Sequence, residues 1–168
     1  MLYVGIDNGV SGSIAILTSS GEVLAYAPTP VKKDLNYTKK KAYVNRVDVG
    51  QLRHLFEEWF QCHPVDEIRV FLERPMINPG RWMASCSAMR CLEATLIALE
   101  SKGIGLTGYM DSKPWQKEML PAGLRGDELK EASRQVGSRK WPHLAKQIAK
   151  QKDADALLIA EYARRKQL

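Results

Sequence analysis

The first seventeen residues, MLYVGIDNGVSGSIAIL, place an acidic residue directly after a strand-forming run. Val4 and Ile6 are typical of a buried strand, Asp7 follows them at once, and strand character resumes over residues 14–17. The intervening NGVSG supplies turn residues. Because a buried carboxylate costs free energy unless nearby groups compensate its charge, Asp7 is expected either to accept hydrogen bonds from nearby donors or to bind a cation.

The chain has 168 residues and 45% hydrophobic content, which is enough for one domain with a core. No apolar run approaches the ~20 residues of a membrane span, and the N-terminus lacks the features of a signal peptide. Cys62, Cys86 and Cys91 form no CxxC pair and are expected to be free thiols in a reducing compartment. We therefore expect a single domain over residues 1–168, without a membrane partner, in the cytoplasm.

The net charge of +6 is concentrated in two segments. Residues 29–46 hold six Lys or Arg against one Asp, and residues 125–150 hold seven Lys or Arg against three acids. Clustered positive charge favours a polyanionic partner, most simply nucleic acid. The alternative is a solvated basic surface that aids solubility.

Hydrophobic periodicity predicts an α/β order of β-β-β-α-β-α-β-α, in which an antiparallel meander leads into parallel strands. Residues 28–46 are polar and basic, and we expect them to form a long mobile insertion. The predicted strands are 2–7, 13–18, 22–27, 68–73 and 104–109, and the predicted helices are 47–62, 82–102, a stretch after Ser112, polar segments over 126–150 interrupted at Gly137 and Pro142, and 153–166.

Two predicted strands end in carboxylates, since Asp7 closes the first strand and Glu73 closes the fourth. In an open α/β sheet, ligands bind beyond the carboxyl ends of the strands. If these two strands are adjacent and parallel, Asp7 and Glu73 lie side by side. A hard divalent cation would relieve their mutual repulsion.

A third acid, Asp155, lies on the apolar face of the last predicted helix together with Leu158 and Ile159. Asp153 would point almost oppositely if the helix has already begun, and its alternative role is that of an N-cap. Glu161 falls off the apolar face and is expected to be solvated. Asp7, Glu73 and Asp155 together predict an oxygen-rich Mg²⁺ site of the kind that hydrolyses phosphodiesters. Each acid taken alone could instead be a cap or part of an ion pair.

The segments GIDNGVSG, FLERP and DADALLIAEYARR resemble, in order, the acidic motifs of RuvC-type Holliday-junction resolvases, within the RNase H-like nuclease superfamily. The stretch MDSKPWQKEM is similar to the passage before the last motif in phage and chloroplast members. The resemblance implies an α/β, RNase H-like, five-stranded mixed sheet (order 3-2-1-4-5) flanked by helices. It also implies a homodimer that cuts four-way DNA junctions symmetrically, with two Mg²⁺ ions (Mn²⁺ as a substitute), leaving 5′-phosphate and 3′-hydroxyl ends.

By motif position, Asp7 matches the first-strand acid, Glu73 the fourth-strand acid and Asp155 the acid on the last helix. The resemblance implies that Asp7 bridges two metal ions, with Glu73 and Asp155 on either side. Many relatives carry an acid or a His three residues before the last acid, whereas this chain has Lys152 there with Asp153 beside it. Asp153 is therefore a candidate fourth metal ligand, and Lys152 a candidate contact for the scissile phosphate or the attacking water.

Basic and aromatic side chains near these acids are candidates for holding DNA, because Lys and Arg bind phosphates and aromatic rings stack on unpaired bases. Trp82 either stacks on a base at the crossover or is the first core residue of its helix. Trp115 is expected in the core, and the apolar helix 82–102 is a candidate dimer interface. The DNA-binding candidates are Lys32, Lys33, Lys39, Lys40, Lys41, Arg74, Asn78, Arg81, Trp82, Lys113 and Lys117.

Three other functions fit parts of the pattern. The segment GIDxGxSG also resembles the phosphate-binding opening of sugar kinases and actin-like ATPases, but those proteins need two such domains. An RNase H-like nuclease acting on another branched DNA, RNA or a hybrid would have the same acids. A non-catalytic junction-binding protein is the third, although three acids would face its own ligand's charge.

Overall fold

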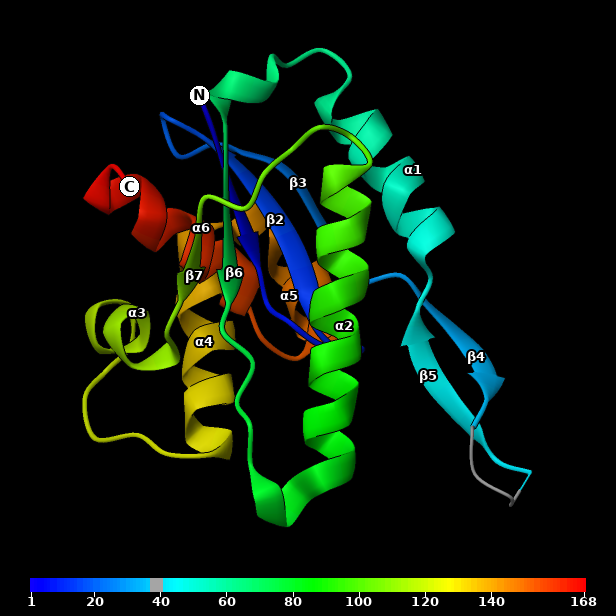
Figure 1. The fold of residues 1–168 in the computed structure, drawn as a ribbon. Coiled ribbons are helices and arrows are strands. Elements are labelled where there is room, and N and C mark those ends of the chain that lie inside the picture. Colours follow the sequence, from blue (N-terminus) through cyan, green and yellow to red (C-terminus); the bar gives the residue numbers. More distant parts are fainter. Residues whose placement is uncertain (37–40) are drawn as a thin grey trace.

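The computed structural model describes residues 1–36 and 41–168, and in this part of the chain a five-stranded mixed sheet lies between two groups of helices (Figure 1). Strands β1, β2 and β3 form an antiparallel meander, and β1, β6 and β7 are parallel. The order across the sheet is β3-β2-β1-β6-β7, with bounds β1 (Leu2–Ile6), β2 (Ser13–Thr18), β3 (Val23–Pro28), β6 (Ile68–Glu73) and β7 (Gly108–Met110).

Counted among the five strands of this sheet alone, the order is the expected 3-2-1-4-5, and the labels differ because two further strands, which do not join this sheet, precede β6. Strands β4 (Val31–Leu35) and β5 (Tyr43–Val47) pair only with each other, and this hairpin stands away from the main sheet (Figure 1). The expected mobile insertion is thus largely a β-hairpin, whose strands carry the strand-forming residues Val31, Tyr43 and Val47 among polar ones. Two of the candidate lysines, Lys39 and Lys40, lie outside the described residues.

Helices cover both faces of the sheet, since alternate side chains of each strand point to opposite faces. Val4 and Ile6 pack in the hydrophobic cluster with α1 and α2, whereas Tyr3 packs in the cluster with α3–α6. The bounds are α1 (Val49–Phe60), α2 (Trp82–Glu100), α3 (Ser112–Met119), α4 (Asp127–Lys140), α5 (Ala145–Gln151) and α6 (Asp155–Lys166), with 3₁₀ turns at Val65–Glu67, Pro79–Arg81 and Pro142–Leu144. None of the helices in the described ranges has the length and apolar character of a membrane span.

Several local expectations are wrong for identifiable reasons. Helix α4 continues through Gly137 without a break. Glycine fits here because α4 packs closely against Ala154, and a Cβ at position 137 would lie 2.3 Å from the Cβ of Ala154. The last helix begins at Asp155 rather than at residue 153. The fifth strand of the sheet is short and begins at Gly108, because Ile104 lies in the preceding coil.

Glu161 is fully buried rather than solvated, because three cations surround its carboxylate. Lys140 of α4 lies 3.0 Å away, and Arg164 and Arg165 each lie 2.8 Å away. Burial alone would raise the pKa of Glu161, but these charge-assisted hydrogen bonds outweigh it and hold the pKa at about 2. The ion pair between Lys140 and Glu161 therefore links α4 to α6.

Helix α6 lies unusually close to the central strand at Gly5. A Cβ on Gly5 would lie 2.1 Å from the carbonyl oxygen of Ala156 and 2.6 Å from the backbone nitrogen of Ala160. Small residues on both elements therefore allow backbone to meet backbone. This contact brings the start of α6, with Asp155, against the end of β1, where Asp7 follows.

We predict that Gly5→Ala lowers the free energy of unfolding by about 1–3 kcal/mol, because the added methyl group forces α6 away from β1. Urea unfolding followed by circular dichroism measures this loss. Gly105→Ala is the control, since a Cβ at Gly105 would meet nothing within 4 Å. Equal stability of the two variants would contradict the close contact.

Candidate active site

Three carboxylates converge where β1 ends and α6 begins. Asp7 directly follows β1, and Asp153 and Asp155 lie at the start of α6. One ligand oxygen of each acid lies within 4.8 Å of those of the other two. Oxygen donors of this kind suit hard divalent cations such as Mg²⁺ or Mn²⁺, so the donor set fits the metal that the sequence predicts.

Protonation of this cluster is strongly perturbed. Burial, reinforced by the charges of Asp155, Glu73 and Asp153, raises the pKa of Asp7 well above its usual range. Burial and the neighbouring Asp153 raise the pKa of Asp155 to about 7, against a lowering hydrogen bond from Ser133. Burial also raises the pKa of Asp153. A divalent cation would relieve this repulsion by stabilising the ionised forms.

Glu73 lies at the neighbouring strand end but outside this tight group. Ile6 pairs with Leu72 in the parallel ladder, so Asp7 and Glu73 occupy equivalent positions, each one residue after this pair. The Nε1 group of Trp115, which is fully buried on α3, donates a hydrogen bond to Glu73 Oε1 at 3.3 Å. The tightest trio is therefore Asp7, Asp153 and Asp155, rather than the trio with Glu73 that the sequence suggested.

The position of Asp153 follows from where α6 begins. Because α6 begins only at Asp155, Asp153 does not point away from the site as a helical residue would. Its Oδ1 accepts a long hydrogen bond of 3.4 Å from the Asp155 backbone, as a weak cap does. Lys152 is exposed and adopts the left-handed conformation (φ 79°) that ends α5, and so directs the chain into this turn.

The segment DNGVSG folds tightly around Asp7. A Cβ at Gly12 would lie 2.1 Å from the Asp7 carbonyl oxygen and 3.2 Å from its Oδ2. Asn8 Nδ2 donates to the carbonyl of Ala88 on α2 at 3.1 Å, which fixes the turn to the opposite layer. Glycine is thus required at position 12 because Asp7 occupies the space where a side chain would be.

Sequence reasoning missed two residues that support the acids. Ser133 on α4 donates to Asp155 Oδ1 at 2.5 Å and accepts from the Ala154 backbone at 3.0 Å. The Tyr26 hydroxyl donates to the Asp153 carbonyl at 3.0 Å. The available signal was the stripe of small residues, Ser133 and Gly137, one turn apart in an otherwise polar helix.

The loop after Glu73 borders a cleft of about 320 Å³ lined by Asn8, Glu73 and Arg74, among others. Arg74 Nε lies 2.7 Å from Asp111 Oδ1, and its guanidinium lies over the Tyr109 ring.

The other candidates differ in exposure. Trp82 is 67% exposed and is not a core residue, whereas Trp115 lies in the core as predicted. The basic candidates Lys32, Lys33, Lys41, Arg81, Lys113 and Lys117 are exposed, and Asn78 uses its Oδ1 to accept from Gly80.

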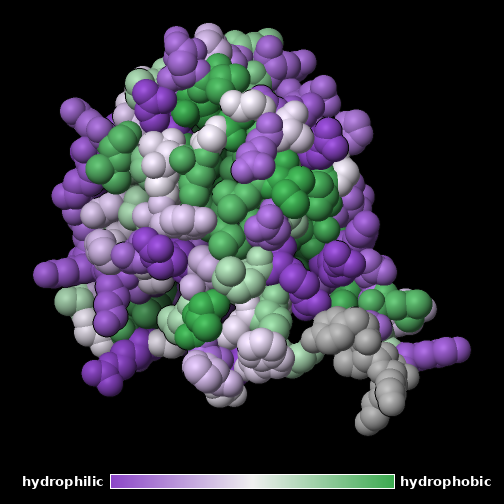
Figure 2. All heavy atoms as spheres, in the orientation of Figure 1, coloured by the Kyte–Doolittle hydropathy of each residue, from purple (hydrophilic) through white to green (hydrophobic). Residues whose placement is uncertain are grey.

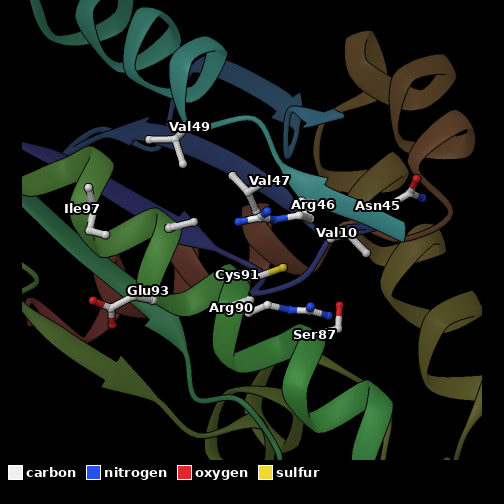
Figure 3. A pocket seen from close by; sticks show the side chains of 11 residues that line it. Val10, Asn45, Arg46, Val47, Val49, Ser87, Arg90, Cys91, Glu93 and Ile97 are labelled. Atoms are coloured by element: carbon white, nitrogen blue, oxygen red, sulfur yellow. The ribbon is translucent and has the colours of Figure 1, made fainter. Parts of the chain in front are cut away.

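A separate pocket of about 250 Å³ lies between the hairpin and α2 (Figure 3). Its wall combines apolar residues such as Val47 and Ile97 with Arg46, Arg90 and Glu93. Arg46 is paired with Asp34 at 3.0 Å. With one carboxylate and two guanidinium groups, this pocket lacks the donor set of a divalent-cation site.

Comparison with known proteins supports the fold. No family model and no curated protein sequence matches the chain. Among solved structures, the chain is similar to RuvC of Thermus thermophilus in complex with a Holliday junction substrate, at 17% identity and a TM-score of 0.54, over 98% of this chain and 96% of that one. A second RuvC structure from Thermus thermophilus has 18% identity and a TM-score of 0.45, over 99% and 97%. The first of these similarities shows that the chain shares the α/β fold of that RuvC structure.

We predict that the metal-free protein loses stability as pH rises from about 4 to about 7. The folded state holds protons on Asp7, Asp153 and Asp155, whose pKa values are raised, whereas the unfolded chain releases them near pH 4. Thermal unfolding in EDTA should show Tm falling over this range, and Mg²⁺ should restore it near pH 8.

Asp155→Asn should flatten this pH dependence, because it removes one raised carboxyl group. Glu161 acts in the opposite direction only below about pH 5, because the unfolded chain takes up its proton near the ordinary pKa of 4.5 whereas the folded state does so near 2. A metal-free protein that gains stability between pH 5 and 8 would contradict the arrangement of the acids.

Proposed function

We propose that this protein is a metal-dependent endonuclease that resolves four-way DNA junctions. The observation that carries the proposal is the convergence of Asp7, Asp153 and Asp155, with Glu73 beside them, at the strand ends of a RuvC-like fold. The similar solved structure is of a protein bound to a Holliday junction substrate, which supports junction DNA as the substrate class.

In this proposal, Asp7, Glu73, Asp155 and Asp153 would hold the Mg²⁺ ions, with Asp7 as the central ligand. Bound metal ions would supply an activated water and neutralise the leaving 3′ oxygen. Trp115 keeps Glu73 in place through its hydrogen bond. Lys152, exposed next to the acids in sequence, would contact the scissile phosphate.

Exposed cations around the site and on the hairpin would hold the DNA arms. Arg74 and Arg81 lie on the loop beside the cleft, and their positive charges would attract phosphate groups that approach the acids. Trp82, with its ring largely exposed, would stack on an unpaired base at the crossover. The remaining proposed contacts are Asn78, Lys113 and Lys117 near the site and Lys32, Lys33, Lys39, Lys40 and Lys41 in the hairpin region.

A homodimer would use the outer face of α2 and the loop before it. Met76 and Ile77 are 77% and 59% exposed, and a hollow of about 550 Å³ is lined by Ile77, Cys86 and Met89, among others. Figure 2 shows hydrophobic side chains in green along the course of α2. Exposed apolar surface of this kind marks an interaction site, and a second copy would place a second metal site for symmetric cutting.

The decisive experiment is cleavage of a synthetic four-way junction with Mg²⁺, with product ends mapped on all strands. We expect paired, symmetric nicks with 5′-phosphate ends, and weaker cutting of plain duplex and of RNA–DNA hybrid. Asp7→Asn should lower the cleavage rate by about 10³-fold or more, because it removes the central ligand. Junction binding should persist or strengthen, since a negative charge near phosphate is lost.

Asp66→Asn serves as the matched control, because Asp66 is exposed in the turn before β6. It should cut at the rate of the unmodified protein. Normal cutting by Asp7→Asn would refute the metal assignment, and preferential cutting of the hybrid would identify an RNA-directed nuclease instead.

We predict that replacing Lys32 and Lys33 with Gln weakens junction binding and reduces the slope of log K against log salt concentration by about 2, one unit for each lost phosphate contact. Binding titrations over a range of salt concentrations measure this slope. Arg53→Gln with Arg139→Gln, which also removes two exposed cations, should leave the slope nearly unchanged. An unchanged slope in the hairpin variant would assign these lysines to a solvated surface.

A further inference from the structure

We infer that Ser133 is a positioning residue that makes the acidic site prefer a small octahedral cation such as Mg²⁺ over Ca²⁺. The inference rests on the proposed metal-dependent function and concerns a residue outside the acidic motifs. Ser133 acts through Asp155, by engaging one of its two carboxylate oxygens.

The hydrogen bonds around Ser133 have a fixed direction. Its Oγ accepts the backbone N–H of Ala154 at 3.0 Å, and Oγ has a single proton left to donate. That proton goes to Asp155 Oδ1, 2.5 Å away. Ser133 is fully buried, so water does not compete for either bond. Asp155 Oδ1 is therefore continuously engaged, and Oδ2 is the oxygen free for another partner.

Packing prevents the serine from moving relative to the acid. One turn further along α4, Gly137 meets Ala154 so closely that a Cβ would lie 2.3 Å from the alanine Cβ. At the far end of α4, Lys140 binds Glu161 of α6 at 3.0 Å. Helix α4 thus contacts α6 at its start and along its length, which holds the Ser133 hydroxyl at a constant place beside Asp155.

A carboxylate with one oxygen engaged in this way suits monodentate coordination. Mg²⁺ demands a near-ideal octahedron, whereas Ca²⁺ takes six to eight oxygens and readily accepts bidentate carboxylates. The Ser133 bond opposes bidentate binding by Asp155, because a cation sharing Oδ1 would have to displace the buried hydroxyl. Partners of this kind, one bond removed from the metal, commonly tune metal affinity.

Metal titrations of the full-length protein without DNA test the inference, with MgCl₂ and CaCl₂ in separate calorimetric or thermal-shift experiments. In Ser133→Ala we expect Mg²⁺ affinity to fall by about 10-fold, while Ca²⁺ affinity stays the same or rises. Ser133→Cys keeps the side-chain size with a weaker donor and should show an intermediate change. Ser133→Thr restores the hydroxyl and should restore the preference for Mg²⁺.

Ser138→Ala is the control, since Ser138 is half-buried on the same helix. It should leave both affinities unchanged. A merely structural role for Ser133 would weaken Mg²⁺ and Ca²⁺ binding by the same factor, and that result would overturn the inference, as would unchanged affinities in both Ser133→Ala and Ser133→Cys. If the unmodified protein binds neither cation, the proposed metal-dependent function fails and this inference with it.

Discussion

Repulsion among buried carboxylates is the constraint around which this molecule is arranged. Burial raises the pKa values of Asp7, Asp153 and Asp155, and neighbouring acids raise those of Asp7 and Asp155 further, so the chain must hold these groups together at a cost in free energy. Two contacts hold them in place. At Gly5, β1 and α6 pack closely together, and the Ser133 hydroxyl donates a hydrogen bond to Asp155. A cation bound by these acids would therefore also stabilise the folded protein.

The parts of the site that depend on local patterns were predictable, and the parts that depend on distant contacts were not. Asp7 and Glu73 could be placed because strand periodicity and parallel pairing fix where strands end. Asp153 entered the cluster because α6 starts two residues later than its sequence suggests. The burial of Glu161 depends partly on Lys140 from another helix, and Ser133 reaches Asp155 across 22 residues. No local periodicity encodes such contacts.

The N-terminal half of α2 takes part in two proposals, DNA binding and dimer formation. Trp82 and Met89 are exposed and line the apolar hollow that a second copy would cover. Trp82 also directly follows Arg81, which lines the cleft beside Glu73 where DNA would enter. A dimer that covered Trp82 completely would remove its ring from DNA. The two proposals are compatible if the second copy covers Met89 and leaves Trp82 at the rim, close to the crossover.

The hydrogen bond from Trp115 to Glu73 gives the protein an internal optical probe. The indole is fully enclosed, in contrast to the exposed ring of Trp82, so the two emit at different wavelengths. Its Nε1 group touches the carboxylate directly. Capture of a cation by Glu73 would therefore alter the surroundings, and with them the fluorescence, of a side chain that the protein already contains.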